Sequence, residues 1–221
     1  MGLSLILLLV AAPCPGAEVG GVVAFHAGPF EGPATLSISL EPAAGQSAPR
    51  TAAERHRLAV IGGVLQPSHL AVHRGDRIQF VNHDSMRHSL RVVGGGADAR
   101  LALGRAGEPE AAAELGLEQG STVHVFCTLH RQLYGRVEVL EDGHLQMLQA
   151  PGEFRFTGIA AGTWRLRVGS VSGILHEREV LAFTAPPAIA ISIPAPAVQM
   201  RPVAEGFRSD RVEDLFPATR P

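Results

Sequence analysis

The chain has 221 residues, of which 46% are hydrophobic and 18% charged, and its formal net charge at pH 7 is −2. This near-neutral balance, without a block of like charge, argues against nucleic acid as a partner. The length suits one or two domains. The 25 glycines and 16 prolines are spread along the chain, which favours many short strands joined by tight turns.

Residues 1–17 have the character of a secretory signal peptide. Their apolar run is too short to span a bilayer and is followed by small residues, so we expect cleavage near Gly16 or Ala17. The positive segment that usually precedes such a run is missing, and a lipid-modified Cys14 is an alternative. No other segment predicts a membrane span. We therefore expect a periplasmic or secreted protein.

The chain contains two cysteines, and the first of them, Cys14, would leave with the signal peptide. Cys127 would then be alone and unable to form an internal disulfide. A single thiol in an oxidising compartment needs protection or a function. Metal ligation would supply both.

Alternation of apolar and polar residues, the period of a β-strand, dominates the chain. It predicts strands at 77–82, 121–127, 135–139, 154–156, 164–168 and 189–193. Since roughly 100 residues make one sandwich, we expect an all-β protein of two sandwich-like units. The segment from Glu108 to Leu117 has an alanine-rich centre with helix propensity, and it predicts either a short helix or a β-edge.

Two segments carry the side chains of a candidate metal site. Residues 80–90 predict a strand and a polar turn that leads to His88, and residues 125–139 predict a strand, a loop and a second strand. Cys127 ends the first of these strands, and His130 lies in the loop. A copper ion that cycles between Cu(I) and Cu(II) suits one thiolate and two imidazoles, with a weak axial ligand that tunes the potential. The pattern therefore predicts a trigonal copper site.

Both segments resemble the cupredoxin family of blue copper proteins, in particular its amicyanin-like and plastocyanin-like members. Asn82 and His88 match the family's spacing of an asparagine, five residues and a histidine after an aromatic strand. Cys127, His130 and Gly135 match its pattern Cys-x-x-His-x-x-Met-x-Gly. Two motifs in the right order make the resemblance more specific than either motif alone.

The resemblance covers residues 58–140 and implies a cupredoxin Greek-key β-sandwich with one type 1 copper ion. It implies that Asn82 bonds the loop at Thr128 and so fixes the thiolate. The family's axial methionine position is Leu133 in this chain, and leucine cannot ligate. Loss of the axial donor predicts a three-coordinate copper with a raised reduction potential. Met86 is an alternative axial donor.

The residues alone leave other interpretations open. The same three ligands would accept zinc, and the fold could have lost its metal. Cys127 and His130 could form a nucleophile–base pair, although no orienting acid or oxyanion loop is evident in the sequence. His83 is a further candidate donor. Since no second histidine cluster indicates a type 2 copper centre, we do not expect an enzyme.

A second pattern, Gly-x-Phe-x-Phe followed by a strand that begins at Trp164, resembles the carboxypeptidase regulatory-like, prealbumin-type β-sandwich. We expect the first strands of this unit within 18–50 and its remainder within 145–195, with the cupredoxin-like unit inserted between them. This arrangement resembles exported bacterial proteins of the methylamine-utilisation type, which indicates context and not a substrate. Residues 196–221 predict a disordered tail.

The resemblance thus implies a single-electron carrier. Its electrons would leave through His130 and the apolar Leu129 and Leu133, a face suited to transient docking. The redox partner would be a protein such as a cytochrome or a dehydrogenase. The alternative is a metal-sequestering or metal-free scaffold protein of the cell envelope.

Overall fold

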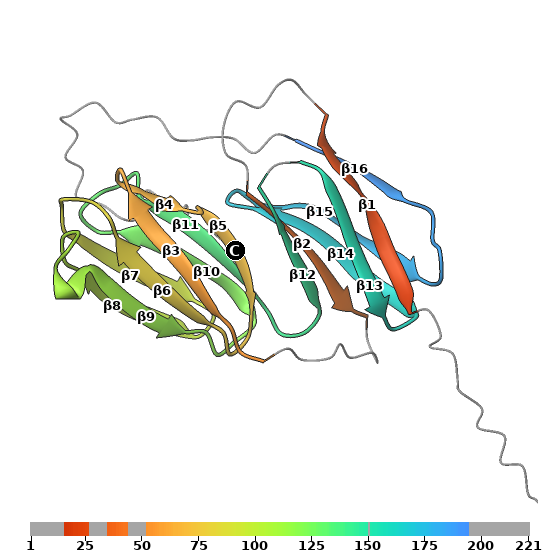
Figure 1. Cartoon of the computed structure of the whole chain (residues 1–221), viewed down its shortest axis with the longest axis horizontal. Helices are drawn as coiled ribbons and strands as arrows, with labels where there is room; N and C mark the ends of the chain where they lie inside the picture. The colour runs from red at the N-terminus through yellow and green to blue at the C-terminus, as the bar shows by residue number, and fades with distance from the viewer. Residues whose placement is uncertain (1–15, 27–34, 44–51, 150, 195–221) are drawn as a thin grey trace, which may run out of the picture.

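A computed structural model describes residues 16–26, 35–43, 52–149 and 151–194 of the chain (Figure 1). Apart from one short 3-10 helix, the regular structure in these ranges consists of β-strands arranged in four sheets. Figure 1 shows them as two sandwiches side by side. The predicted all-β fold class is confirmed.

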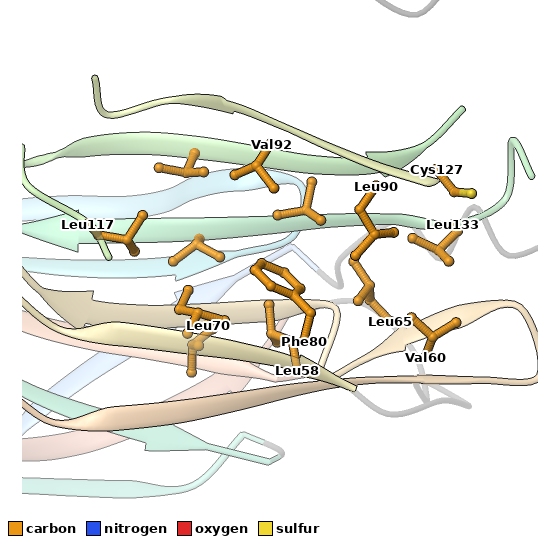
Figure 2. Packing of buried hydrophobic residues seen from close by; sticks show 14 of the residues in the cluster. Leu58, Val60, Leu65, Leu70, Phe80, Leu90, Val92, Leu117, Cys127 and Leu133 are labelled. Atoms are coloured by element: carbon orange, nitrogen blue, oxygen red, sulfur yellow. The ribbon is translucent and has the colours of Figure 1, made fainter. Parts of the chain in front are cut away.

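The first sandwich consists of the sheets β4-β3-β6-β9 and β5-β11-β10-β7-β8. Its strands are β3 (Arg55–Ile61), β4 (Val64–Gln66), β5 (His69–His73), β6 (Arg77–Asn82), β7 (His88–Gly94), β8 (Ala97–Leu103), β9 (Ala112–Gly116), β10 (Ser121–Cys127) and β11 (Tyr134–Leu140). The predicted alternation holds, since Ile78 and Phe80 of β6 face the core together with Val123 and Val125 of β10. Figure 2 shows this core, with Cys127 and Leu133 at one of its ends.

The second sandwich consists of the sheets β13-β1-β16 and β12-β2-β14-β15. Its strands are β1 (Ala17–Phe25), β2 (Leu36–Pro42), β12 (His144–Leu148), β13 (Glu153–Ile159), β14 (Gly162–Ser170), β15 (Gly173–Ala182) and β16 (Ile189–Ile193). Trp164 lies in its core with no exposed surface, and its indole Nε1 donates to the Ala160 carbonyl at 2.9 Å. The similarity of this second sandwich to the regulatory-like module stays a prediction, and so do the domain boundaries given above.

In the sequence, the strands of the first sandwich lie between the first two strands of the second sandwich and its remaining strands. β1 pairs with β13 and β16, and β2 pairs with β12 and β14, although all of β3–β11 lies between them in the sequence. The segment Glu108–Leu117, for which the sequence left two possibilities, forms the 3-10 turn η1 (Pro109–Ala111) and then β9, which pairs with β6. Both expectations for this segment are therefore met in part.

Predictions for the two ends of the chain fall mostly outside the described residues. These are the signal peptide, except for Gly16 and Ala17, and the tail at 196–221. Ala17 is the first residue of β1 and is 5% exposed in the core of the second sandwich. Within the described ranges, no helix is long and apolar enough to cross a membrane.

A buried polar cluster joins the two sandwiches. The Ser37 hydroxyl of β2 donates to Glu138 Oε2 of β11 at 3.0 Å, and His69 Nε2 of β5 lies 2.9 Å from the same hydroxyl. Arg136 Nη2 is 3.0 Å from Glu138 Oε1. Burial raises the pKa of Glu138, while Arg136 and the Ser37 hydroxyl act against this rise. The cluster favours one placement of β2 against β11 because each buried polar group needs its partner across the boundary.

Gly169 of β14 leaves room for this cluster. A Cβ at this position would lie 2.5 Å from Glu138 Oε2 and 2.5 Å from Ser37 Oγ. We expect Gly169→Ala to lower the free energy of unfolding by about 1–3 kcal/mol, as overpacking does, measured by urea unfolding. Gly116→Ala is the control, because its Cβ would meet only the end of the Glu118 side chain at 3.3 Å. Equal urea midpoints for Gly169→Ala and the parent chain would contradict this account.

Candidate metal centre

The structure brings the three predicted ligands together. His88, Cys127 and His130 each offer one ligand atom, and these atoms all lie within 4.8 Å of one another. Cys127 Sγ is 3.6 Å from His130 Nδ1, and the two imidazole centroids are 4.7 Å apart. His88 and Cys127 are 2% and 4% exposed, while His130 is half-buried. A buried thiolate and two imidazoles therefore converge at one end of the first sandwich.

Strand pairing sets the positions of His88 and Cys127. β7 begins at His88, and β10 ends at Cys127, which lies opposite Leu90 of the antiparallel β7. The Thr128 amide donates to the Ser89 carbonyl at 2.9 Å and continues this pairing by one step. The side chains of His88 and Leu90 point to the same face because successive strand residues alternate. The two ligands therefore meet on the core side of the sheet.

The loop between β10 and β11 places His130. Its two ends are tied by backbone hydrogen bonds, from the Cys127 amide to the Leu133 carbonyl and from the Leu133 amide to the His130 carbonyl, both 3.1 Å. The Leu129 amide lies 3.4 Å from Cys127 Sγ and donates to it. The loop thus folds His130 back over the Cys127 sulfur.

The hydrogen bonds of His88 leave one ring nitrogen for a metal. His88 Nε2 lies 3.1 Å from Asp84 Oδ2, whereas His88 Nδ1 is buried and has no hydrogen-bond partner. A buried ring nitrogen without a partner is costly unless something fills its place. A thiolate and two imidazoles are the donor set of trigonal copper sites. The residues present therefore fit a copper ion.

Electrostatics favour neutral imidazole at this site. Burial lowers the pKa of His130, and His88 adds to the effect, while Asp84 acts against it. Metal ligation requires the deprotonated ring. The pKa of Asp84 lies below its usual value; burial opposes this, but hydrogen bonds from the Gly63 and Gly62 amides and from His88 outweigh it. A neutral His130 ring and an ionised Asp84 carboxylate are therefore present together.

Asn82 does not hold the thiolate loop as the resemblance implied. Its Nδ2 donates to the Met86 and Gly104 carbonyls, both at 2.7 Å, and its Oδ1 accepts from the Asp84 amide at 2.9 Å. One amide hydrogen is therefore used by the turn before His88 and the other by the segment that follows β8. The loop at Thr128 is tied instead to Ser89, by the Thr128 amide at 2.9 Å and its hydroxyl at 3.3 Å. Asn82 shapes the turn that delivers the first histidine.

The two candidate axial residues differ in burial. Leu133 has no exposed surface and belongs to the core of the first sandwich, next to Cys127 in Figure 2. Met86 is 48% exposed. His83, the further candidate donor, is exposed and its Nε2 lies 2.8 Å from Arg57 Nη2. Leu133 is thus the buried one of the two axial candidates, and its hydrocarbon side chain has no donor atom.

Asp84 was missed by the sequence reasoning, although a signal for it exists. It stands four residues before His88 inside the polar turn, and it faces the Gly62–Gly63 turn that joins β3 and β4. Consecutive glycines with exposed amides are typical acceptor-binding turns. The pairing could not be chosen from sequence alone because the two segments are about twenty residues apart.

The fold and the cluster define a class: an all-β protein whose first sandwich has a candidate His–Cys–His metal centre at the end of one sheet. Solved structures of amicyanin are similar to part of it. A reduced mutant form is 26% identical and covers 38% of this chain and 81% of its own, with a TM-score of 0.32. The reduced Cu(I) form of another amicyanin mutant at pH 4 is 21% identical and covers 47% and 98%, with a TM-score of 0.34.

No family model and no curated protein matches the chain. The TM-scores of the amicyanin structures are low. The case for the metal centre therefore rests on its own geometry.

Proposed function

We propose that this protein binds one type 1 copper ion through His88, Cys127 and His130 and carries single electrons in the periplasm or outside the cell. The observation that carries the proposal is the convergence of these three ligand atoms within 4.8 Å, two of the residues being buried. Bound copper would supply a one-electron couple between Cu(II) and Cu(I). The predicted export signal also supports this proposal, because its removal would leave Cys127 as a single cysteine.

The chain's own part is to hold the ligands still while the charge changes. Cys127 and His88 are fixed by strand pairing, and His130 by the two backbone hydrogen bonds that close its loop. A ligand set that does not rearrange lowers the cost of electron transfer, since preorganised groups need no reorganisation. In this proposal the protein is a carrier and not an enzyme.

The proposed exit for electrons is the half-buried edge of His130. Leu129, the residue before it, is 62% exposed. Leu133, also expected on this face from the sequence, has no exposed surface and does not contribute to it. Small apolar faces of this kind suit weak, short-lived docking. The proposed partner is a redox protein such as a cytochrome or a dehydrogenase.

A spectrum tests the proposal. The purified full chain, given one equivalent of Cu(II), should develop an intense visible thiolate-to-copper band that disappears on reduction and returns on oxidation. Cys127→Ser should abolish the band, because the thiolate is its source, while the matched control Cys14→Ser should keep it. A colourless parent chain that retains no copper after dialysis would defeat the proposal.

Leu133 favours a second candidate, a metal-sequestering or metal-free scaffold protein of the cell envelope. A fully buried leucine beside the ligands offers no axial donor and so disfavours Cu(II) relative to Cu(I). A sequestering protein would bind Cu(I) and show no visible band with Cu(II). A scaffold would bind neither ion.

A further inference from the structure

The Asp84 carboxylate connects the outer nitrogen of His88 to the Gly62–Gly63 turn. Asp84 Oδ2 lies 3.1 Å from His88 Nε2 and accepts the Gly63 amide at 2.8 Å, while Oδ1 accepts the Gly62 amide at 2.6 Å. The Asp84 side chain is 10% exposed and the His88 side chain not at all. The Asp84 carbonyl also accepts the Ala106 amide at 2.9 Å. The Gly62 and Gly63 amides therefore hold the carboxylate, and the Ala106 amide holds the backbone carbonyl of the same residue.

This geometry determines which nitrogen of His88 carries the proton. A carboxylate accepts hydrogen bonds only, so His88 must present Nε2–H to Asp84. In a neutral ring the other nitrogen then has a free lone pair. That nitrogen, Nδ1, is the buried atom for which the structure shows no partner.

We propose that Asp84 is a positioning residue that holds His88 as the Nε2–H tautomer, aims Nδ1 at the metal and sets the balance between Cu(II) and Cu(I). The inference rests on the proposed function. A carboxylate behind a ligating histidine fixes the ring and makes its ligating nitrogen more basic, and loss of such a partner typically costs 10–100-fold in metal affinity. The negative charge favours the more highly charged ion. Asp84 thus counteracts the effect of Leu133, which lacks an axial donor.

Two substitutions separate the charge from the hydrogen bond. Asp84→Asn can keep an oxygen towards His88 and Gly63 while it removes the negative charge and the acceptor of the Gly62 amide. Asp84→Ala removes both. Asp98→Asn is the matched control, because Asp98 is an exposed carboxylate of the edge strand β8 and is paired with Arg91 of β7. Circular dichroism and thermal unfolding show that each variant is folded.

The first measurement is metal binding and potential. We expect Asp84→Asn to weaken Cu(II) binding about tenfold or more with a smaller effect on Cu(I). A tenfold difference between the two ions corresponds to a rise of about 59 mV in reduction potential. Asp84→Ala should show a larger rise and a displaced visible band, and Asp98→Asn less than a twofold change. Potentials that are equal in Asp84→Asn and Asp98→Asn would overturn the proposal.

The second measurement needs no copper. Two-bond ¹H–¹⁵N spectra of the metal-free parent chain should show His88 as the Nε2–H tautomer, and Asp84→Ala should shift it towards Nδ1–H. A parent chain with His88 in the Nδ1–H form would overturn the role of Asp84, even if copper binds. A parent chain without the copper band but with the expected tautomer would defeat the proposed function and leave the positioning role of Asp84 supported.

Discussion

Acidification from pH 7 to pH 4 should lower the free energy of unfolding by about 3 kcal/mol through His69 alone. Burial, followed by the charge of Arg136, lowers the pKa of His69 from 6.5 to about 3. The unfolded chain therefore takes up a proton at this position near pH 6.5, whereas the folded chain does so only near pH 3. The free energy of unfolding falls as the pH is lowered wherever the unfolded state binds more protons. Each pH unit in this window corresponds to about 1.4 kcal/mol.

Glu138 acts in the opposite direction within the same cluster. Its pKa is raised in the folded chain, mainly by burial, so its contribution to stability is present below the unfolded pKa and is lost as the pH rises through the folded pKa. Within this cluster, the change in the free energy of unfolding on acidification is therefore the loss from His69 minus the gain from Glu138. The two contributions can be separated by substitution.

Urea unfolding of the metal-free chain at pH 7 and pH 4 measures this effect. His69→Gln keeps a donor for Ser37 and should remove the part of the pH dependence that His69 contributes. Glu138→Gln should make the pH dependence steeper, because the opposing contribution of the carboxyl group is gone. His83→Gln, which replaces an exposed histidine, is the control and should leave the dependence as it is. A parent chain as stable at pH 4 as at pH 7, together with a flat Glu138→Gln variant, would refute the assignment to His69.

The second large effect is expected at Leu133. Leu133→Ala removes a side chain with no exposed surface and should lower the free energy of unfolding by about 2–5 kcal/mol. Leu133→Met keeps the volume and should cost less than about 1.5 kcal/mol. Methionine would also add a thioether donor, which stabilises Cu(II) and lowers the reduction potential. A tenfold preference for Cu(II) would appear as a fall of about 59 mV.

The measurements for Leu133 are chemical denaturation without metal and a redox titration of the copper-loaded chain. Leu117→Met is the matched control, because Leu117 is 1% exposed in the same core and lies at the end opposite Cys127 and Leu133 in Figure 2. It should cost a similar amount of stability and leave the potential unchanged. A Leu133→Met variant with the potential of the parent chain would show that residue 133 does not face the metal.

The sequence was sufficient for those features that depend on local pattern. The period of two in β6 and β10 placed Phe80 and Cys127 on inward faces, because alternation is a property of each strand by itself. The spacing from Cys127 to His130 likewise implies a tight loop, which the structure contains. The order of the three candidate ligands along the chain could therefore be predicted, and the structure brings them together.

Features that depend on distant partners could not be predicted in this way. Asn82 was assigned to the wrong neighbour because an amide can bond to any carbonyl that the fold brings near, and here the Met86 and Gly104 carbonyls are nearer. His69 belongs to no motif in the sequence, and its burial follows only from the contact between two sheets. The segment of β9 carried competing signals, since alanine favours helix while the edge of β6 offers strand partners.

The chain order of the strands has a consequence for synthesis at the ribosome. The strands β3–β11 are continuous in sequence, so the first sandwich can close as soon as β11 has emerged. β1 and β2 emerge earlier but find their partners only when β12–β16 follow. Because domains fold largely as units during translation, β1 and β2 lack their native partners while the first sandwich forms. In this interval their unpaired edges can pair with other strands, as exposed edge strands do.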